Sequence, residues 1–227
     1  LRHQLDAAEV LRRHPQTQKV EQVPAIAAAD VDQPQRAQPG VVETTLAPLF
    51  DAILEHNPAA LGFQARWKKA MPLYLEWANA HEAEGWQFAF GEHGVEKPLH
   101  WQGGSVTLHG RIDRIDRNAQ GEWLVLDYKA TEHASLKKRL THREDHQLAF
   151  YGLLAEPEPA GASYVAIDGS KAGAVPVELF ADWRAALQAQ IQTGMQAIAE
   201  GHPLPATGIS KTCQWCEVRG LCRKGAW

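Results

Sequence analysis

Two acidic residues and a lysine stand at positions from which they could act in one reaction. Asp127 and Lys129 are two residues apart at the end of the apolar run Trp123–Lys129, so in a strand they share a face at a spacing of roughly 7 Å. A charged pair at the end of a buried strand costs free energy unless a partner or a metal compensates it. Carboxylates with a backbone carbonyl form an oxygen-only site suited to Mg²⁺ or Mn²⁺. Such an ion polarises a phosphodiester and lowers the pKa of water, and Lys129 beside it can orient or deprotonate the attacking water.

The segment before this run supplies another carboxylate. From residue 106 to residue 116 the sequence alternates with a period of two, which places Val106, Leu108 and Ile112 on one face and His109, Arg111 and Asp113 on the other. A short polar turn at residues 118–121 predicts an antiparallel hairpin that brings Asp113 beside Asp127. Gly110 inside the first strand allows a close approach of another backbone or a ligand. A structural salt-bridge network at the end of a sheet is the alternative interpretation.

Three short motifs, in this order, resemble the RecB/AddB branch of the PD-(D/E)XK nucleases, which includes the CRISPR-associated RecB-like exonucleases. They are Gly110-Arg-Ile-Asp-Arg-Ile-Asp116, Val125-Leu-Asp-Tyr-Lys129 and Gln147-Leu-Ala-Phe-Tyr151. With a cysteine-bearing tail after them, the resemblance covers roughly residues 86–224. It implies an α/β fold of the restriction-endonuclease type, with a mixed central sheet flanked by helices and an N-terminal helical extension.

The resemblance also implies roles for single residues. The catalytic residues would be Asp113, Asp127 and Lys129, and the metal would be bound by Asp113, Asp127 and the backbone carbonyl of Tyr128. Gln147 and Tyr151, four residues apart on one face of a helix, would pack against the active site and contact nucleic acid.

Two further positions of the family's pattern are less well defined here. Glu96 stands where such proteins often carry a glutamate, with a surface residue at a strand end as the alternative. The family usually has a metal-binding histidine on a helix before the sheet. His3 and His56 are two of the histidines before the helix expected over residues 61–84, and neither is assigned that role.

The three cysteines have the spacing of metal ligands, Cys213-x-x-Cys216-x₅-Cys222. In the RecB-like branch a similar tail supplies three thiolates to a [4Fe–4S] cluster, which needs a fourth ligand that this chain lacks among its cysteines. Zinc bound by three cysteines and a histidine such as His202 is the rival. Three reduced thiols packed in a small core are the third interpretation.

Charge is uneven along a chain of net charge −4. Basic residues between the second and third motifs, at Lys137, Lys138, Arg139 and Arg143, are expected to border the active site and hold DNA phosphates. A solvated surface is the alternative. No apolar run is long enough to span a bilayer.

The elements needed to position these residues divide the chain into three parts. Residues 1–85 are expected to form a helical extension and connector, with a helix over 1–13 and two helices over 43–84 broken near Asn57-Pro58. Residues 86–201 are the expected nuclease core, with strands at 86–90, 105–116, 122–129, 162–168 and 174–180. Helices are expected at 145–154 and at 182–200, the latter N-capped by Asp182. Residues 202–227 form the expected cysteine-bearing clasp.

The function expected from these features is metal-dependent DNA hydrolysis by an exonuclease of the kind used in recombination and repair. A catalytically silent DNA-binding or scaffold module with the same fold is the rival, and RNA is an alternative substrate. Because the chain starts at Leu1, it is expected to be a piece of a longer protein, with a helicase domain or subunit as partner. A cytoplasmic location without membrane association is expected.

Overall fold

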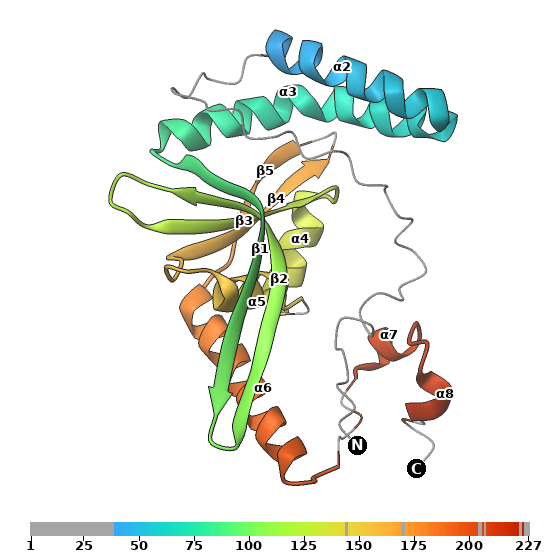
Figure 1. The fold of residues 1–227 in the computed structure, drawn as a ribbon. Helices are drawn as coiled ribbons and strands as arrows, with labels where there is room; N and C mark the ends of the chain where they lie inside the picture. The colour runs from blue at the N-terminus through green and yellow to red at the C-terminus, as the bar shows by residue number, and fades with distance from the viewer. Residues whose placement is uncertain are drawn as a thin grey trace. The chain divides into compact units, whose positions relative to one another are not determined.

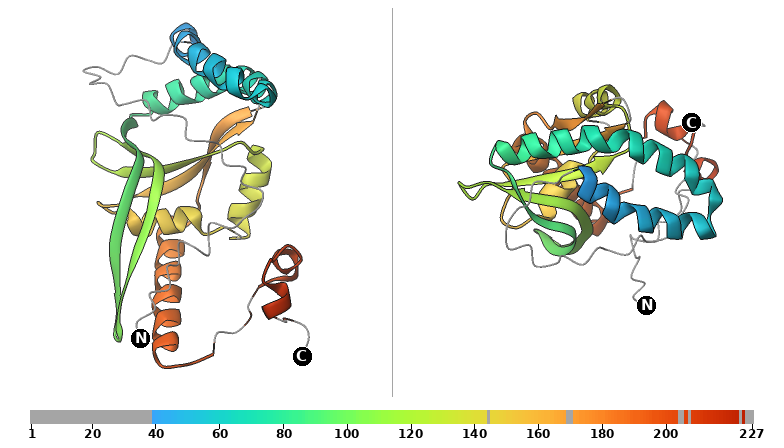
Figure 2. Two further views of the ribbon diagram at one scale, coloured as in Figure 1. Left: turned by 45° about the vertical axis from the view of Figure 1, so that its right-hand side comes forward. Right: turned by 90° about the horizontal axis from the view of Figure 1, so that it is seen from above.

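A five-stranded mixed sheet carries the predicted hairpin. The computed structural model describes residues 39–143, 145–168, 171–203, 206, 208–222 and 224. The strands are β1 (Gln87–Trp101), β2 (Gly104–Arg117), β3 (Trp123–Lys129), β4 (Gly161–Asp168) and β5 (Lys171–Pro176), in that spatial order. The helices are α2 (Pro39–His56), η1 (Pro58–Ala60), α3 (Leu61–Ala83), α4 (His133–Thr141), α5 (Gln147–Leu154), α6 (Phe180–Ala199), α7 (Ser210–Cys213) and α8 (Arg219–Cys222). Figures 1 and 2 show their arrangement.

The strand directions follow from the lengths of the connections. β1, β2 and β3 are antiparallel and joined by short turns. In the β2–β3 turn the side-chain oxygen of Asn118 accepts the N–H groups of Gln120 and Glu122, and Gly121 takes a left-handed backbone (φ 83°). β3 and β4 are parallel, which requires a long crossover; α4 and α5 form it. β5 then returns antiparallel to β4. The mixed α/β fold with flanking helices is therefore as predicted.

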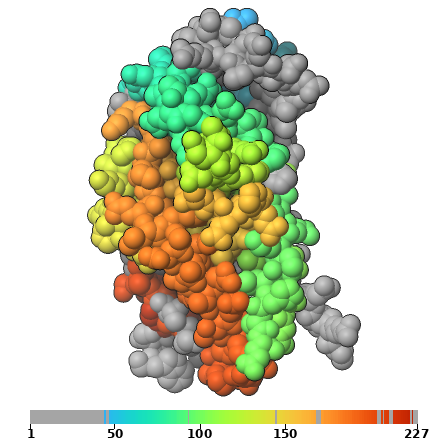
Figure 3. Space-filling model, turned by 90° about the vertical axis from the view of Figure 1, so that its left-hand side faces the viewer, coloured from blue at the N-terminus to red at the C-terminus, as the bar shows by residue number. Residues whose placement is uncertain are grey.

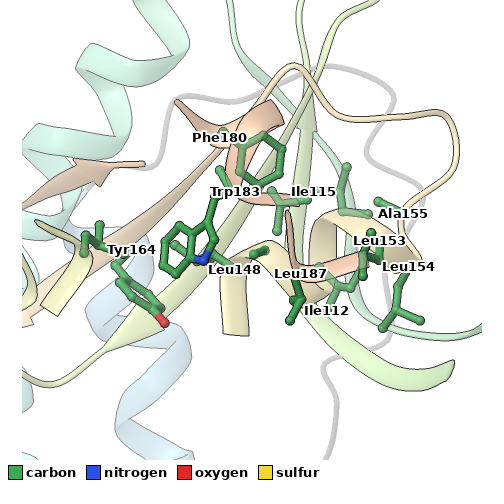
Figure 4. Close-up of a cluster of buried hydrophobic side chains, with 14 of the residues drawn as sticks. Ile112, Ile115, Leu148, Leu153, Leu154, Ala155, Tyr164, Phe180, Trp183 and Leu187 are labelled. Atoms are coloured by element: carbon green, nitrogen blue, oxygen red, sulfur yellow. The ribbon is translucent and has the colours of Figure 1, made fainter. Parts of the chain in front are cut away.

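The main hydrophobic core lies between the sheet and the helices α5 and α6. The buried cluster in Figure 4 combines Ile112 and Ile115 of β2, Leu148, Leu153 and Leu154 of α5, and Phe180, Trp183 and Leu187 of α6. α6 also runs along the β1–β2 hairpin (Figure 3), and Gln192 Nε2 donates to the carbonyl of His100 there. Because α5 packs directly on β2, β3 and β4, its first residue, Gln147, is carried to the end of β3.

α2 and α3 form the helical pair before the sheet. They meet through Phe50 and Phe63, and the break between them falls at Asn57 and η1, as predicted. α3 packs against β4 and β5. Within the described residues no helix is long and apolar enough to cross a membrane. The helix expected over 1–13 lies outside the described residues, and the division into 1–85, 86–201 and 202–227 stays a prediction.

Several predicted boundaries were wrong, each for a local physical reason. The first strand does not end at residue 90 but continues to Trp101, because it is a sheet edge whose polar residues face solvent and break the apolar pattern. Helix α4 was not predicted as an element. The strand expected at 174–180 is β5 and ends at Pro176, beyond which Leu179 adopts a left-handed backbone (φ 51°). Asp182 is not the N-cap of α6; Leu179 holds that position without a side-chain cap, and Asp182 lies in the first turn.

A glycine at the α5–α6 contact gives a direct test of this packing. A Cβ on Gly152 would lie 2.5 Å from Phe180 Cζ and 3.2 Å from Arg184 Cδ. We therefore expect Gly152→Ala to lower the free energy of unfolding by about 1–3 kcal/mol, measured by denaturant titration. The matched control is Gly194→Ala, because Gly194 is also helical and has nothing within 4 Å of the added methyl. This control should be neutral or stabilising by up to about 1 kcal/mol. Equal stability of the two variants would contradict the α5–α6 packing.

Candidate active site

Three of the predicted side chains form a closed set of polar contacts at the end of β3. Lys129 Nζ lies 2.7 Å from Asp127 Oδ2 and donates to Gln147 Oε1 at 2.8 Å. Gln147 Nε2 in turn donates to Asp127 Oδ1 at 2.8 Å. The shared face expected from the period of two is therefore present, and the amide of Gln147 ties α5 to both charged residues.

Asp113 joins this set at the point where β2 and β3 part. Their ladder stops at the pair Arg114–Leu126, whereas β3 continues to pair with β4 as far as Lys129. Beyond the last paired residue, Asp113 Oδ2 accepts the backbone N–H of Tyr128 at 3.2 Å. The carboxylate thus takes the place of a carbonyl in the ladder, which fixes Asp113 against the chain segment between Asp127 and Lys129.

The environment of Asp127 opposes its ionisation. The side chain is 1% exposed, and burial raises the pKa of Asp127 from 3.8 to about 6. The ion pair with Lys129 acts in the opposite direction, whereas the charge of Asp113 raises the pKa further. A buried carboxylate that is costly to ionise, next to another carboxylate, is the electrostatic situation that a bound cation relieves.

Beneath Lys129 lies Tyr164, a buried residue of β4 that the sequence did not point to. Tyr164 pairs with Asp127 in the parallel register, and Lys129 Nζ lies 5.3 Å from its ring centroid. Burial and the neighbouring carboxylate of Asp145 raise the pKa of Tyr164 well above its usual value. Asp145 Oδ1 also accepts the backbone N–H of Gln147 at 3.0 Å. Its position two residues before the Gln147 motif is the signal that could have identified it.

Tyr151 reaches the same cluster from the next turn of α5. Gln147 Nε2 donates to Tyr151 Oη at 2.9 Å, so the four-residue spacing brings the two side chains together on one helix face. Burial raises the pKa of the Tyr151 hydroxyl, and the charges of Asp127 and Asp113 add to this effect. The hydroxyl is therefore a neutral group beside the carboxylates.

A further buried polar network lies behind Tyr128, whose side chain points to the opposite face of β3 from Asp127. Arg114 donates to both oxygens of Asp116, at 2.6 and 2.9 Å, and to Tyr128 Oη at 3.0 Å. His81 Nε2 lies 2.8 Å from Asp116 Oδ2, and Tyr74 Oη lies 3.1 Å from Tyr128 Oη. The network joins α3 to β2 and β3. It was missed in the sequence, although Arg114 and Asp116 stand two apart in the first motif.

Aromatic rings enclose this network. The His81 ring stacks on Trp77 and Trp86, with ring centroids 5.1 and 6.1 Å away. Burial alone would raise the pKa of the fully buried Asp116, but the hydrogen bonds from His81 and Arg114 outweigh it and hold that pKa below its usual value. At Asp116 the contacts with its partners therefore outweigh burial, whereas at Asp127 burial outweighs the contacts with Lys129 and Gln147.

The predicted basic residues are exposed, and in the sequence they lie between Lys129 and Gln147. Lys137, Lys138 and Arg139 are exposed on α4, and Arg143 is exposed just after it. Glu96 is an exposed residue of β1 opposite His109. It is not among the residues that contact Asp113, Asp127 or Lys129.

The three cysteines line one pocket of about 240 Å³, together with Ser210, Arg219 and Lys224. Cys213 and Cys216 are half-buried and Cys222 is exposed, all as free thiols. His202 lines a different pocket, beside Trp101. In the described part of the chain, no group of three or more histidine, cysteine or acidic side chains is arranged to hold a metal, so an iron–sulfur or zinc site at the cysteines stays a prediction.

The donor set around β3 fits a hard divalent cation. Mg²⁺ usually takes one or two carboxylates and keeps several water ligands, and here Asp113 and Asp127 are two carboxylates held together by the segment 127–129. The burial of Asp127 next to the carboxylate of Asp113 favours a positive ligand at this place, and the raised pKa of Asp127 agrees with it. Asp113, Asp127 and the carbonyl of Tyr128 are the residues that would hold it.

Comparisons with known proteins bear on the chain as a whole. A family model described as the PD-(D/E)XK nuclease superfamily matches residues 6–223. The comparison with curated proteins gives no match. Similar solved structures include one titled "Crystal structure of SSO0001", at 15% identity and a TM-score of 0.42, over 81% of this chain and 80% of that chain.

Proposed function

The chain belongs to the PD-(D/E)XK nuclease superfamily, and from this membership we propose that it is a DNA nuclease that hydrolyses phosphodiester bonds with Mg²⁺ or Mn²⁺. The observation that carries the proposal is the joint placement of Asp113, Asp127 and Lys129, with Asp127 almost fully buried and its pKa raised to about 6. A structural salt bridge has no need of a second, repelling carboxylate beside the first.

Each residue has a distinct role in this proposal. Asp113 and Asp127 would hold the cation, which would supply Lewis-acid polarisation of the phosphodiester. Lys129 orients the attacking water and neutralises negative charge that develops on the phosphoryl group. Gln147 is a positioning residue, because one amide contacts both Asp127 and Lys129. Tyr164 covers the inner side of Lys129 and directs its ammonium group toward Asp127 and Gln147.

The DNA-binding surface would be the basic edge that precedes α5. Lys137, Lys138 and Arg139 on α4 and Arg143 after it present charges that can contact backbone phosphates without reading sequence. Gln147 and Tyr151 would approach the DNA strand at the site itself. Exposed cations on one short stretch of chain make binding sensitive to salt.

We further propose, from the three motifs, that the chain is of the RecB/AddB-like type and acts as an exonuclease in recombination or repair. A helicase domain or subunit as partner and a cytoplasmic location are part of the same proposal. The cysteine pocket would hold an iron–sulfur cluster or zinc, completed by a ligand from elsewhere. An absorbance band on the order of 400 nm in the purified protein would distinguish a cluster from zinc.

A cleavage assay tests the proposed function. Labelled single-stranded DNA, duplex DNA and RNA of the same sequence are incubated with the protein in Mg²⁺, Mn²⁺ or EDTA. We expect DNA cleavage that requires a divalent cation and that falls by about 10³-fold in Lys129→Ala and in Asp113→Asn, since each removes several kcal/mol of transition-state stabilisation. Lys68→Ala, which removes an exposed lysine of α3, is the matched control and should cleave as the wild type does.

The other outcomes identify the rivals. Cleavage that persists in both variants would overturn the assignment of the site. Binding of DNA without cleavage in any cation would favour the scaffold module, and cleavage of RNA alone would correct the substrate.

A further inference from the structure

An exposed histidine next to the site is held by a buried tryptophan. Trp183 Nε1 on α6 donates to His146 Nδ1 at 3.2 Å, and the two rings meet at 60° with centroids 5.9 Å apart. His146 is exposed and is the N-cap residue of α5, immediately before Gln147. Because Nδ1 accepts this hydrogen bond, the ring carries its proton on Nε2. His146 therefore presents an N–H donor directly before Gln147, the residue that contacts Asp127 and Lys129.

The same tryptophan carries a cation on its ring. The guanidinium carbon of Arg143 lies 5.9 Å from the Trp183 ring centroid, within the range of a cation–π contact. Arg143 reaches this position with a left-handed backbone (φ 49°), a conformation that residues other than glycine rarely adopt. Trp183 itself is 3% exposed. It belongs to the buried cluster that also contains Tyr164 (Figure 4).

Arg143 and His146 differ from the basic residues of α4 in their contact with a buried ring. Lys137 and Lys138 are exposed on α4, whereas Arg143 and His146 both contact Trp183. Pre-ordered donors lose less conformational entropy on binding. Through Tyr164, the cluster around Trp183 is also continuous with the floor of the site under Lys129. A group bound by Arg143 and His146 is thus held at a defined place relative to Asp127.

We propose that Arg143 and His146, held by Trp183, form a phosphate-binding corner that fixes the DNA backbone beside the catalytic carboxylates. Arg143 supplies charge and His146 supplies a neutral, directed donor. A cation and a directed N–H donor that contact the same tryptophan are the kinds of group that bind backbone phosphates. The inference rests on the proposed function, because it assigns a subsite to the same DNA strand.

Binding of a fluorescent single-stranded oligonucleotide in EDTA, where cleavage is not expected, tests the corner. Affinity is measured at several salt concentrations for each variant. Arg143→Ala should weaken binding about tenfold and lower the salt dependence by about one phosphate contact. His146→Ala should weaken binding several-fold and leave the salt dependence unchanged, since a neutral donor releases no counterion. Arg66→Ala, on α3 and also exposed, is the charge control and should bind as the wild type does.

Two further variants separate positioning from a general loss of structure. Trp183→Phe keeps a ring under Arg143 but removes the N–H, so it should reproduce the loss seen in His146→Ala and not that in Arg143→Ala. His146→Gln keeps one acceptor and one donor and should bind within about twofold of the wild type. Thermal unfolding of each variant shows whether the fold is intact.

The failures are distinguishable. If Arg143→Ala and His146→Ala both bind DNA as tightly as the wild type, the phosphate-binding corner is wrong and the proposed function is unaffected. A wild-type protein that neither binds DNA in EDTA nor cleaves it in Mg²⁺ or Mn²⁺ overturns both.

Discussion

Replacing Asp127 by asparagine should abolish DNA cleavage and at the same time make the metal-free protein more stable. Cleavage in Mg²⁺ should fall by about 10³-fold, because the variant lacks a carboxylate that would bind the cation. The stability should rise because ionising the buried carboxyl group of Asp127 costs free energy in the folded state. The side chain is 1% exposed, and burial raises its pKa to about 6. Asparagine keeps the shape, but its single oxygen can accept from Gln147 Nε2 or from Lys129 Nζ and not from both. The side chain of Lys129 is 25% exposed and can turn to water, so the loss of this partner costs little.

The sign of the pH dependence follows from the direction of the shift. The pKa of Asp127 is raised from 3.8 to about 6 in the folded state. The folded protein is therefore more stable when this carboxyl group is protonated, at low pH, and it loses this stability as pH rises through 6. The difference between Asp127→Asn and the wild type should therefore be near zero at pH 4. Above pH 7 it should reach about 2–3 kcal/mol in favour of the variant. For a chain of this size that corresponds to a melting temperature higher by about 5–10 °C.

Thermal unfolding in EDTA at pH 4, 6 and 8 measures this difference. Added Mg²⁺ should then raise the melting temperature of the wild type, because the ion binds the folded state, and should leave that of Asp127→Asn unchanged. A variant that is inactive and also less stable in EDTA at pH 8 would show that Asp127 is a structural residue and would sink the metal-site assignment.

The part of the site that the sequence predicted is the part encoded by short, regular spacing. The period of two placed Asp127 and Lys129 on one face, and a four-residue turn implied that Asp113 lies near them. The spacing of four likewise brought Gln147 to Tyr151. All of these contacts arise within one strand, one helix or one hairpin, where geometry follows directly from spacing.

The contacts that were missed join elements far apart in the chain. His81 meets Asp116 across 35 residues, and Tyr74 meets Tyr128 across 54. Spacing does not reveal which helix covers which face of a sheet, so the role of α3 behind β3 was not predictable from periodicity. The same holds for Trp183, which reaches His146 across 37 residues. The edge strand β1 was predicted too short for a different reason. Its exposed residues are polar and interrupt the apolar pattern on which the prediction relied.

Replacing Asp116 by asparagine is the same chemical change as Asp127→Asn, and the structure predicts the opposite result for stability. Asp116 is fully buried like Asp127, but its contacts with His81 and Arg114 outweigh burial and lower its pKa. The variant would leave Arg114, itself buried, without its counter-charge. Removing one member of a buried ion pair costs about 3–5 kcal/mol, so the melting temperature should fall on the order of 10 °C.

The pH dependence again has a defined sign. Hydrogen bonds from His81 and Arg114 hold the pKa of Asp116 below its usual value. Its stabilising contribution is therefore present above about pH 4 and is lost as pH falls below that value. The deficit of Asp116→Asn should be present at pH 7 and shrink toward pH 3, whereas the gain in Asp127→Asn grows from pH 4 to pH 7.

Measuring both variants in one series of unfolding experiments separates a functional buried carboxylate from a structural one. Tyr128→Phe provides a milder companion to Asp116→Asn, because it removes a hydroxyl bonded to Arg114 and Tyr74 and should cost about 1–2 kcal/mol. If Asp116→Asn is as stable as the wild type at pH 7, the network behind β3 does not hold α3 to the sheet. If both asparagine variants are destabilised alike, burial alone governs the two positions and the contrast drawn from their partners is wrong.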